Sequence, residues 1–269
     1  MYVRYAHKLE ADMSDDTDGR DPDIIAGFAK GLTVIEAFGA SQPRLSIADV
    51  ARRTGLERAT ARRCLMTLTK LGYADFDGKF FSLTPRLLRL GYAYLSSTPL
   101  PRIVQPFLEQ LSEATEESCS ASILDGGEIV YIARAAQRRV MSIGLNVGSR
   151  LPAYCASMGR VLLAALPPEE ARAILARTDR RALTAKTLTD LDALMDELAR
   201  IRRDGYAIID EELEVGLRSI AVPIVTTAGK VVAAMNIGAQ AARVDLDTMR
   251  TAFLPRMLKV QRDLAPLVG

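Results

Sequence analysis

Two short amphipathic segments separated by one glycine restrict the fold of this chain more than any other feature of its sequence. The first segment opens with Ser46 and has Asp49 three residues later, which predicts a helix that begins with a capping box. Gly55 closes it, since a glycine readily adopts the left-handed backbone of a tight turn. The second segment, residues 57–71, is again helical in its spacing. We therefore expect a helix-turn-helix between residues 46 and 71.

The second of these helices has two chemically different sides, because successive residues are rotated by about 100°. One side is apolar and should pack inward: Ala61, Cys64, Leu65, Leu68 and Leu71. The other should face outward: Ala59, Arg62, Arg63, Met66 and Lys70. Arg62 and Arg63 are placed to reach guanine edges or phosphates in a major groove. A solvated helix face would show the same pattern, so that alternative stays open for the two arginines taken alone.

The flanking segments complete a winged helix. Residues 24–38 have apolar side chains at helical spacing and should form a preceding helix. After the pair, Asp77–Gly78 separates two short strand-like runs, which predicts a hairpin. Lys79 lies on this wing and could meet the adjacent groove or the DNA backbone. Three helices followed by a hairpin give a winged helix-turn-helix over residues 24–84.

Seven residues are candidate DNA contacts on this interpretation. Arg58 and Thr60, near the start of the second helix, could hold phosphates or touch bases. The full set is Ser46, Arg58, Ala59, Thr60, Arg62, Arg63 and Lys79. Arg52 and Arg53 could contact phosphate, or could only solubilise the first helix.

Charge is segregated along the chain in a way that supports this interpretation. The formal net charge is +2. Residues 1–23 carry a net −4, residues 24–98 carry +6, and residues 99–269 are neutral. A basic segment beside a neutral one suggests a nucleic-acid-binding domain joined to a domain with a different function. The acidic, aperiodic residues 1–23 are expected to form a flexible arm.

A linking helix should cover residues 85–97, within a linker that ends at residue 101. Its apolar stripe could belong to a core or to a dimer seam. Pro99 and Pro101 then mark a domain boundary, and residues 102–269 should form the second domain. Here we expect helices at 103–115, 156–166, 168–177, 190–204 and 246–264, and strands at 119–124, 128–134, 140–145, 206–210, 219–226 and 230–238. Turns at Asp125–Gly126–Gly127 and Ala228–Gly229 would make hairpins, so the fold class is α+β around a mainly antiparallel sheet.

The chemistry of common catalytic and metal sites is poorly represented. The single histidine, His7, lies in the acidic arm, which disfavours Ser–His, Cys–His and His–metal chemistry. Three scattered cysteines indicate reduced thiols rather than a disulfide or metal framework. Cys155 is therefore a weak candidate nucleophile, and a structural role is favoured for Glu211, Glu212 and Glu214, with Glu212 the most buried. We expect no enzyme activity, no metal and no cofactor.

The sequence resembles the IclR family of bacterial transcription regulators over about residues 24–265. The resemblance rests on GLTVIEAF, SIADVARRTGLERATARRCLMTL and LTPRLLRLG in the first half, and on GSRLPAYCASMGRVLLAAL, RRDGYAIIDEELEVGLRSIAVPI and GKVVAAMNIG in the second. The segments SMGRVLLA and EELEVGLRSIAVP most resemble the corresponding segments of regulators of protocatechuate, 4-hydroxybenzoate and β-ketoadipate catabolism. The resemblance implies a GAF-like second domain that binds a small organic acid, often aromatic.

The resemblance also implies a set of effector contacts. They are Ala156, Ser157, Met158, Gly159, Ser219, Asn236 and Gly238. Independently, exposed N–H groups at a helix start near Ser157 would favour a carboxylate. Two departures from the family pattern are Ile209, where an Asp is often found, and Gly238, where a small hydroxyl is common. Arg134 and Arg150 are possible counter-ions for the acid, and surface charge is the alternative.

The resemblance further implies DNA-binding domains that dimerise, with tetramers common, and control of a nearby catabolic operon. Expected partners are double-stranded operator DNA, the acid effector, a second copy of the chain and, for an activator, RNA polymerase. Without a signal peptide or a long apolar run, a cytoplasmic location and no membrane contact are expected. Two other functions remain: a DNA-architectural protein whose second half only oligomerises, and an enzyme fused to a DNA-binding domain.

Overall fold

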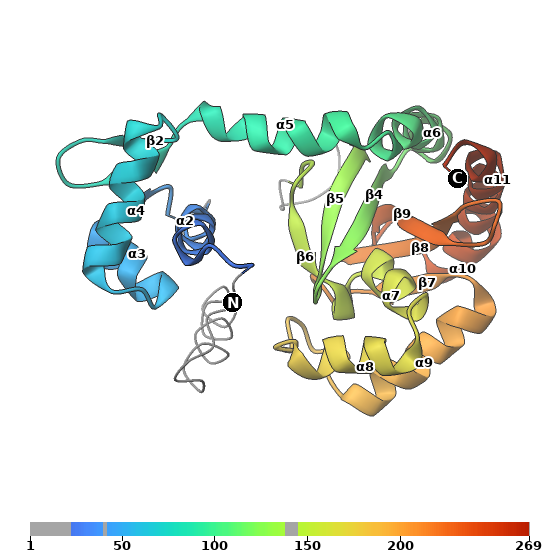
Figure 1. Cartoon of the computed structure of the whole chain (residues 1–269). Coiled ribbons are helices and arrows are strands. Elements are labelled where there is room, and N and C mark those ends of the chain that lie inside the picture. Colours follow the sequence, from blue (N-terminus) through green and yellow to red (C-terminus); the bar gives the residue numbers. More distant parts are fainter. Residues whose placement is uncertain (1–22, 40–41, 138–144, 269) are drawn as a thin grey trace. The chain divides into compact units, whose positions relative to one another are not determined.

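The computed structural model describes residues 23–39, 42–137 and 145–268 (Figure 1). The chain divides into two compact units, with the division between Ser97 and Thr98. Within the described residues no helix is long and apolar enough to cross a membrane.

The first unit is a helical domain with a small antiparallel sheet. Its elements are α2 (Ala26–Glu36), β1 (Arg44–Leu45), α3 (Ile47–Thr54), α4 (Arg58–Lys70), β2 (Ala74–Phe76), β3 (Phe81–Leu83), a 3-10 turn (Pro85–Leu87) and α5 (Leu88–Ser97). The strands pair in the order β1-β3-β2. The core that joins helices and sheet contains Val34, Leu45, Val50, Ala61, Leu65 and Phe81. The expected winged helix-turn-helix is present, with β2 and β3 as the wing.

The start and end of α3 follow from two local signals in the sequence. The Ser46 hydroxyl accepts from the Asp49 backbone N–H at 3.2 Å, and the Ser46 N–H donates to the Asp49 carboxylate at 3.1 Å. This reciprocal capping box satisfies donors that a helix N-terminus otherwise leaves unpaired. Gly55 ends the helix with a φ of 74°, in the left-handed region. Both features confirm the sequence prediction.

The second unit is built around one six-stranded antiparallel sheet with the strand order β6-β5-β4-β9-β8-β7. Its strands are β4 (Ser118–Asp125), β5 (Glu128–Ala135), β6 (Arg150–Pro152), β7 (Ala207–Asp210), β8 (Leu217–Val225) and β9 (Val231–Gln240). Its helices are α6 (Leu100–Thr115), α7 (Ser157–Ala164), α8 (Pro168–Arg177), α9 (Leu191–Asp204), α10 (Leu246–Thr248) and α11 (Leu254–Leu264). The predicted α+β class is confirmed.

Helices cover both faces of this sheet (Figure 1). Helices α7, α8 and α9 pack on one face around a core that includes Ile129, Tyr131 and Ala221. Helices α6 and α11 pack on the other face around Ile220, Val222 and Ile224. Because side chains alternate along a strand, the two cores lie on opposite sides of the same strands.

Several elements differ from the sequence prediction. The strand expected at 140–145 falls mostly on residues 138–144, which lie outside the described residues. Strand β6 was not predicted, because its three residues are too short for a periodic pattern. Helix α6 begins at Leu100, since Pro101 is tolerated in a first helical turn. The last helix contains a π-helical turn at Met249–Phe253, just before Pro255, whose ring nitrogen cannot donate a helical hydrogen bond.

Candidate nucleic-acid interface and ligand pocket

The outward face of α4 is basic and accessible. Arg58, Arg62 and Arg63 are exposed, and Ala59 is exposed beside them. The opposite side of the helix is anchored in the core by Ala61, Leu65 and Leu68. A helix fixed on one side by apolar packing and carrying free guanidinium groups on the other can enter a major groove.

Two predicted positions on α4 are wrong. Leu71 was expected to be buried, but its side chain is 53% exposed because α4 ends at Lys70 and Leu71 is the C-cap. Met66 was expected on the exposed side, but it is partly buried and packs against the core of the first unit. An unbranched methionine can bend back along a helix and fill a gap between apolar neighbours.

Four polar side chains near α4 have defined surroundings. The Ser46 hydroxyl donates to the Asp49 carboxylate at 2.7 Å, so it is part of the helix cap. Thr60 is partly buried at the edge of the groove between α2 and α4. Arg53 donates to the Ala37 carbonyl at 2.7 Å and therefore joins α3 to the end of α2. Arg52 is exposed and ion-paired with Asp49, so it remains accessible for phosphate.

The wing presents two cations around one aromatic ring. Lys79 is exposed, and its Nζ lies 5.1 Å from the centre of the Phe80 ring. The Arg44 guanidinium lies 5.4 Å from the same ring and pairs with Asp77. The hairpin signal in the sequence predicts Lys79 as a contact on the wing. It does not predict Arg44, because nothing in the sequence indicates that β1 joins the wing sheet.

An apolar groove of about 590 Å³ lies between α2, α4 and α5 in the first unit. Its apolar lining includes Phe28, Leu32, Ile35, Leu68, Leu71 and Leu90. Phe28 is 68% exposed and Leu90 is 51% exposed. Large side chains of this kind are seldom left exposed together on a monomer, so this face is a candidate contact surface.

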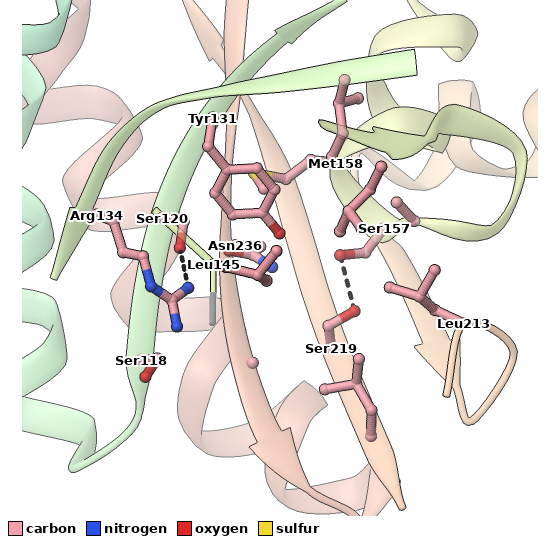
Figure 2. A pocket seen from close by; sticks show the side chains of 15 residues that line it. Ser118, Ser120, Tyr131, Arg134, Leu145, Ser157, Met158, Leu213, Ser219 and Asn236 are labelled. Atoms are coloured by element: carbon pink, nitrogen blue, oxygen red, sulfur yellow. Dashed lines mark hydrogen bonds between the residues drawn. The ribbon is translucent and has the colours of Figure 1, made fainter. Parts of the chain in front are cut away.

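The second unit contains a small cavity between its sheet and the N-terminus of α7 (Figure 2). Six of the seven predicted effector contacts line it: Ala156, Ser157, Met158, Ser219, Asn236 and Gly238. The rest of the lining comes from β4, β5, β6, the start of β8 and neighbouring loops: Ser118, Ser120, Ile129, Tyr131, Arg134, Leu145, Leu151, Leu213 and Leu217. Its volume is about 30 Å³, close to the share of one water molecule in the liquid.

The seventh predicted contact, Gly159, is not among the residues that line the cavity. A Cβ at this position would lie only 2.3 Å from the Ala153 carbonyl oxygen. The missing side chain therefore allows α7 to start against the preceding 3-10 turn, Ala153–Cys155, rather than allowing a ligand to approach. The sequence correctly indicates a close approach here, but the approaching group is the backbone of the same chain.

One end of the pocket is cationic. Arg134 donates from Nη1 to the Ser120 hydroxyl at 2.9 Å (Figure 2). Its Nε is buried and has no hydrogen-bond partner among the described residues. A buried donor without a partner is costly, so an acceptor placed here would be stabilised. The alternative counter-ion, Arg150, instead pairs with Glu128 and Asp125 and does not line the cavity.

A β-bulge directs Arg134 into the pocket. Ala121 pairs with Ala133 and Ser122 pairs with Tyr131, so Ile132 is an extra residue in β5. Ile132 and Ala133 both belong to the core on the α6 and α11 side. The alternation is therefore shifted, and Tyr131 and Arg134 lie on the same face although they are three residues apart. Bulges commonly redirect a side chain in this way beside a functional site.

The other end of the pocket carries hydroxyl groups. Ser219 donates to Ser157 at 2.9 Å, and both side chains are buried. Tyr131 and Asn236 lie between this pair and Arg134 (Figure 2). Burial raises the pKa of Tyr131 to about 12, so its phenol is neutral at physiological pH. The Asn236 Oδ1 is buried, and no residue in the described part of the chain donates to it. The pocket can thus accept a molecule with an anionic end and a hydrogen-bonding end.

A buried ion pair fixes the helix that carries Ser157. Arg160 of α7 is 2% exposed and donates from Nη1 and Nη2 to the two carboxylate oxygens of Glu212 at 2.8 and 2.5 Å. Its Nε donates to the Tyr154 carbonyl at 2.8 Å. Bidentate pairing of this kind fixes orientation as well as charge. Glu212 therefore has a structural environment, as the sequence interpretation favoured.

The remaining catalytic candidates do not assemble a reactive site. Glu211 pairs with the exposed Lys186 and has a φ of 59°, in a turn after β7. Burial raises the pKa of the Cys155 thiol to about 12, so this sulfur stays protonated and is a poor nucleophile. Among the described residues no group of three or more His, Cys, Asp or Glu is placed to hold a metal ion. His7 lies outside the described residues.

Family models match most of the chain. The model described as bacterial transcriptional regulator IclR C-terminal matches residues 92–265, and the IclR helix-turn-helix domain matches residues 28–78. These two matches cover the ligand pocket and most of the winged helix, respectively.

Individual relatives agree with the family models. The Pca regulon regulatory protein of Pseudomonas putida is 47% identical over 245 residues, which are 91% of this chain and 84% of the relative. The p-hydroxybenzoate hydroxylase transcriptional activator of Acinetobacter baylyi is 38% identical over 273 residues, or 100% and 98% of the two chains. A crystal structure of an IclR homologue from Microbacterium hydrocarbonoxydans, in complex with 4-hydroxybenzoate, has a TM-score of 0.71 at 25% identity and covers 89% of this chain and 99% of its own.

Proposed function

Because the chain belongs to the IclR family of bacterial transcriptional regulators, we propose that its pocket beside α7 binds a hydroxylated aromatic acid or a β-ketoadipate-pathway acid that controls operator binding. The observation that carries this proposal is the polarity of the pocket. At one end Arg134 has a buried Nε that no described residue pairs with, and the Ser157–Ser219 pair lies at the other.

The two ends of the pocket suggest how such acids are oriented. The Arg134 guanidinium supplies a full positive charge for a carboxylate, and Ser120 supplies a neighbouring hydroxyl. A ring hydroxyl then meets Ser157 and Ser219 at the start of α7. A second carboxylate, as in β-ketoadipate, would meet the unpaired N–H groups of the same helix N-terminus. The relatives named for the Pca regulon and for p-hydroxybenzoate hydroxylase support this effector class.

The size of the cavity suggests how binding changes the protein. A volume of about 30 Å³ holds roughly one water molecule, so an aromatic acid has to displace lining side chains. Met158 of the lining has an unbranched side chain with three rotatable bonds, so it can adopt a different conformation when the pocket opens. A ligand alters a conformational equilibrium only through different affinities for its states, and a pocket that has to open provides that difference.

For the first unit, we propose that α4 reads bases in a major groove while the wing contacts the adjacent backbone. Arg62 and Arg63 are the candidate base contacts, and Arg58, Lys79 and Arg44 are candidate phosphate contacts. The charge segregation of the sequence supports this assignment, since non-specific DNA affinity depends on phosphate neutralisation. Ser46, Ala59 and Thr60 remain predicted contacts.

We also propose that the first unit forms a homodimer through the surface of α2 and α5. Phe28, Leu88 and Tyr92 are each more than two-thirds exposed there, beside the groove of about 590 Å³. A dimer places two reading helices on a palindromic operator, and a dimer of dimers is a further assembly of the same kind. RNA polymerase would be an additional partner of an activator. The protein would act in the cytoplasm, and without enzymatic activity.

The test of the effector is a thermal-shift panel of 4-hydroxybenzoate, protocatechuate, β-ketoadipate and related acids, repeated with operator DNA. A ligand that binds only the folded state stabilises it and so raises the melting temperature. At a ligand concentration of a hundred times Kd, the stabilisation is about 2.7 kcal/mol. At least one acid should shift the melt and change the DNA affinity. If no acid in the panel changes either quantity, the effector class is wrong.

The test of the reading helix is operator binding by Arg63→Ala, with Arg102→Ala, an exposed arginine of the second unit, as the control. Loss of a base contact should weaken specific binding by about 1–3 kcal/mol and relax sequence preference at one position. Operator binding equal to that of the unmodified protein would remove Arg63 from the reading set.

A further inference from the structure

A side chain outside the pocket holds the backbone of its cationic residue. The Arg134 N–H donates to the Gln105 Oε1 at 3.1 Å, and the Gln105 Nε2 donates to the Arg134 carbonyl at 3.1 Å. Gln105 belongs to α6 and does not line the cavity. Its Nε2 also donates to Glu109, one turn further along the helix, at 2.8 Å. One primary amide therefore satisfies both backbone groups of Arg134.

The geometry of the sheet explains why these groups are free for Gln105. Strand β6 pairs with β5 only as far as Val130, so no described strand borders β5 at Arg134. On the other side Arg134 lies opposite Ser120 of β4. In an antiparallel pair the N–H and carbonyl of one residue point to the same side. Here both groups of Arg134 point away from β4. Ser120 and Arg134 therefore form a non-hydrogen-bonded pair, in which the two side chains lie close together.

We propose that Gln105 is a positioning residue for acid recognition. This inference rests on the proposed function, in which Arg134 holds the effector carboxylate. The bulge at Ile132 lies two residues before Arg134 and locally disrupts the β4–β5 pairing. The Gln105 amide binds the Arg134 N–H and carbonyl where no described strand pairs with β5, and it fixes the backbone immediately after the bulge. The guanidinium then starts from a fixed Cα and reaches the pocket with Nη1 on Ser120.

The experiment compares two probes on the full-length protein, 4-hydroxybenzoate and its uncharged analogue 4-hydroxybenzamide, by titration calorimetry. Gln105→Leu removes both hydrogen bonds at similar side-chain size. The matched control is Gln110→Leu, an exposed glutamine on the same helix. Gln105→Leu should weaken binding of the acid by roughly tenfold. This figure is the lower end of the loss of metal affinity that is seen when a metal-binding side chain loses the hydrogen-bond partner that orients it. Affinity for the amide should stay within about twofold, because the amide carries no charge for Arg134.

Three results separate this inference from the proposed function. If the unmodified protein binds neither the acid nor the amide, the proposed function fails and this inference fails with it. If Arg134→Met loses the acid but Gln105→Leu binds it as tightly as the unmodified protein, Gln105 has no positioning role and the proposed function survives. Equal losses for acid and amide would indicate a general structural effect and would also overturn the inference.

A second variant, which keeps one of the two hydrogen bonds to Arg134, provides a test if Gln105→Leu does not fold. Gln105→Glu, combined with Glu109→Gln so that two carboxylates do not face each other, retains an acceptor for the Arg134 N–H but cannot donate to the Arg134 carbonyl. Its acid-to-amide affinity ratio should lie between those of the unmodified protein and Gln105→Leu. A ratio equal to that of the unmodified protein would show that the donated hydrogen bond contributes nothing. If Gln105→Leu does not fold, this ratio alone decides the inference.

Discussion

Replacing Glu212 by alanine should destabilise the second unit more than any replacement of a surface acid. The change leaves Arg160 buried, with a guanidinium that is 2% exposed and has lost two hydrogen bonds. It also removes the acceptor of the Leu188 backbone N–H, which lies 2.9 Å from Glu212 Oε2. A buried charge without its partner is expensive because it was removed from water and is no longer compensated.

The magnitude follows from what Arg160 retains. Breaking a buried ion pair costs about 3–5 kcal/mol. Arg160 still donates to the Tyr154 carbonyl, and Glu197 lies 4.0 Å from Nη1. These contacts favour the lower end, about 3 kcal/mol. In a unit of this size each 1 kcal/mol changes the melting temperature by about 2–4 °C, so we expect a decrease of roughly 6–12 °C.

The assay is chemical and thermal unfolding of Glu212→Ala, with Asp179→Ala as the surface control. Asp179 pairs with the exposed Arg181, so its loss should cost less than about 1 kcal/mol. A double variant, Arg160→Met with Glu212→Leu, removes the unpaired charge and should recover part of the stability. A loss below about 1 kcal/mol for Glu212→Ala, or a double variant no more stable than the single one, would refute this reasoning.

Two further predictions concern buried positions. Gly159→Ala places a Cβ 2.3 Å from the Ala153 carbonyl oxygen and should lower the free energy of unfolding by about 3 kcal/mol in urea titrations; a change below about 0.5 kcal/mol would contradict it. Burial raises the pKa of the Glu117 carboxyl above its ordinary 4.5, and Arg243, 3.3 Å away, offsets this only in part. The folded state thus binds more protons, so stability should fall as pH rises from 4.5 through the raised pKa. Glu117→Gln should remove this slope and stabilise the protein at pH 7, and an unchanged slope in urea unfolding across that range would exclude the assignment.

The features that sequence predicted are those determined by local interactions. The boundaries of α3 follow from Ser46, Asp49 and Gly55, which act within one turn of the backbone. The expected α4 and the paired strands β8 and β9 likewise appear within about two residues of their predicted ends, because side-chain period and turn residues are local signals. Six predicted pocket residues are brought together, because the family resemblance carried that long-range information.

The features that sequence missed depend on non-local geometry. Strict alternation from Tyr131 would place Arg134 on the opposite face, and the sequence of β5 does not reveal that Ile132 forms a bulge. Ser118 and Ser120 alternate on β4, a pattern that could have indicated a polar wall. Their place in the pocket nevertheless required knowing that β4 lies between β5 and β9. The orientation of Met66 depended in the same way on neighbours distant in the chain.

The extra residue in β5 makes acid recognition sensitive to chain length as well as to side-chain identity. Deleting Ile132 would leave Tyr131 and Arg134 two residues apart on the same face, but inserting one further residue beside the bulge would turn Arg134 toward α6, although all the residues of the pocket would still be present. A three-nucleotide insertion in the gene could therefore convert a pocket suited to acids into one suited to neutral molecules. Regulators of this design can gain or lose a class of inducer through a single in-frame insertion, a route that comparing substitutions alone would overlook.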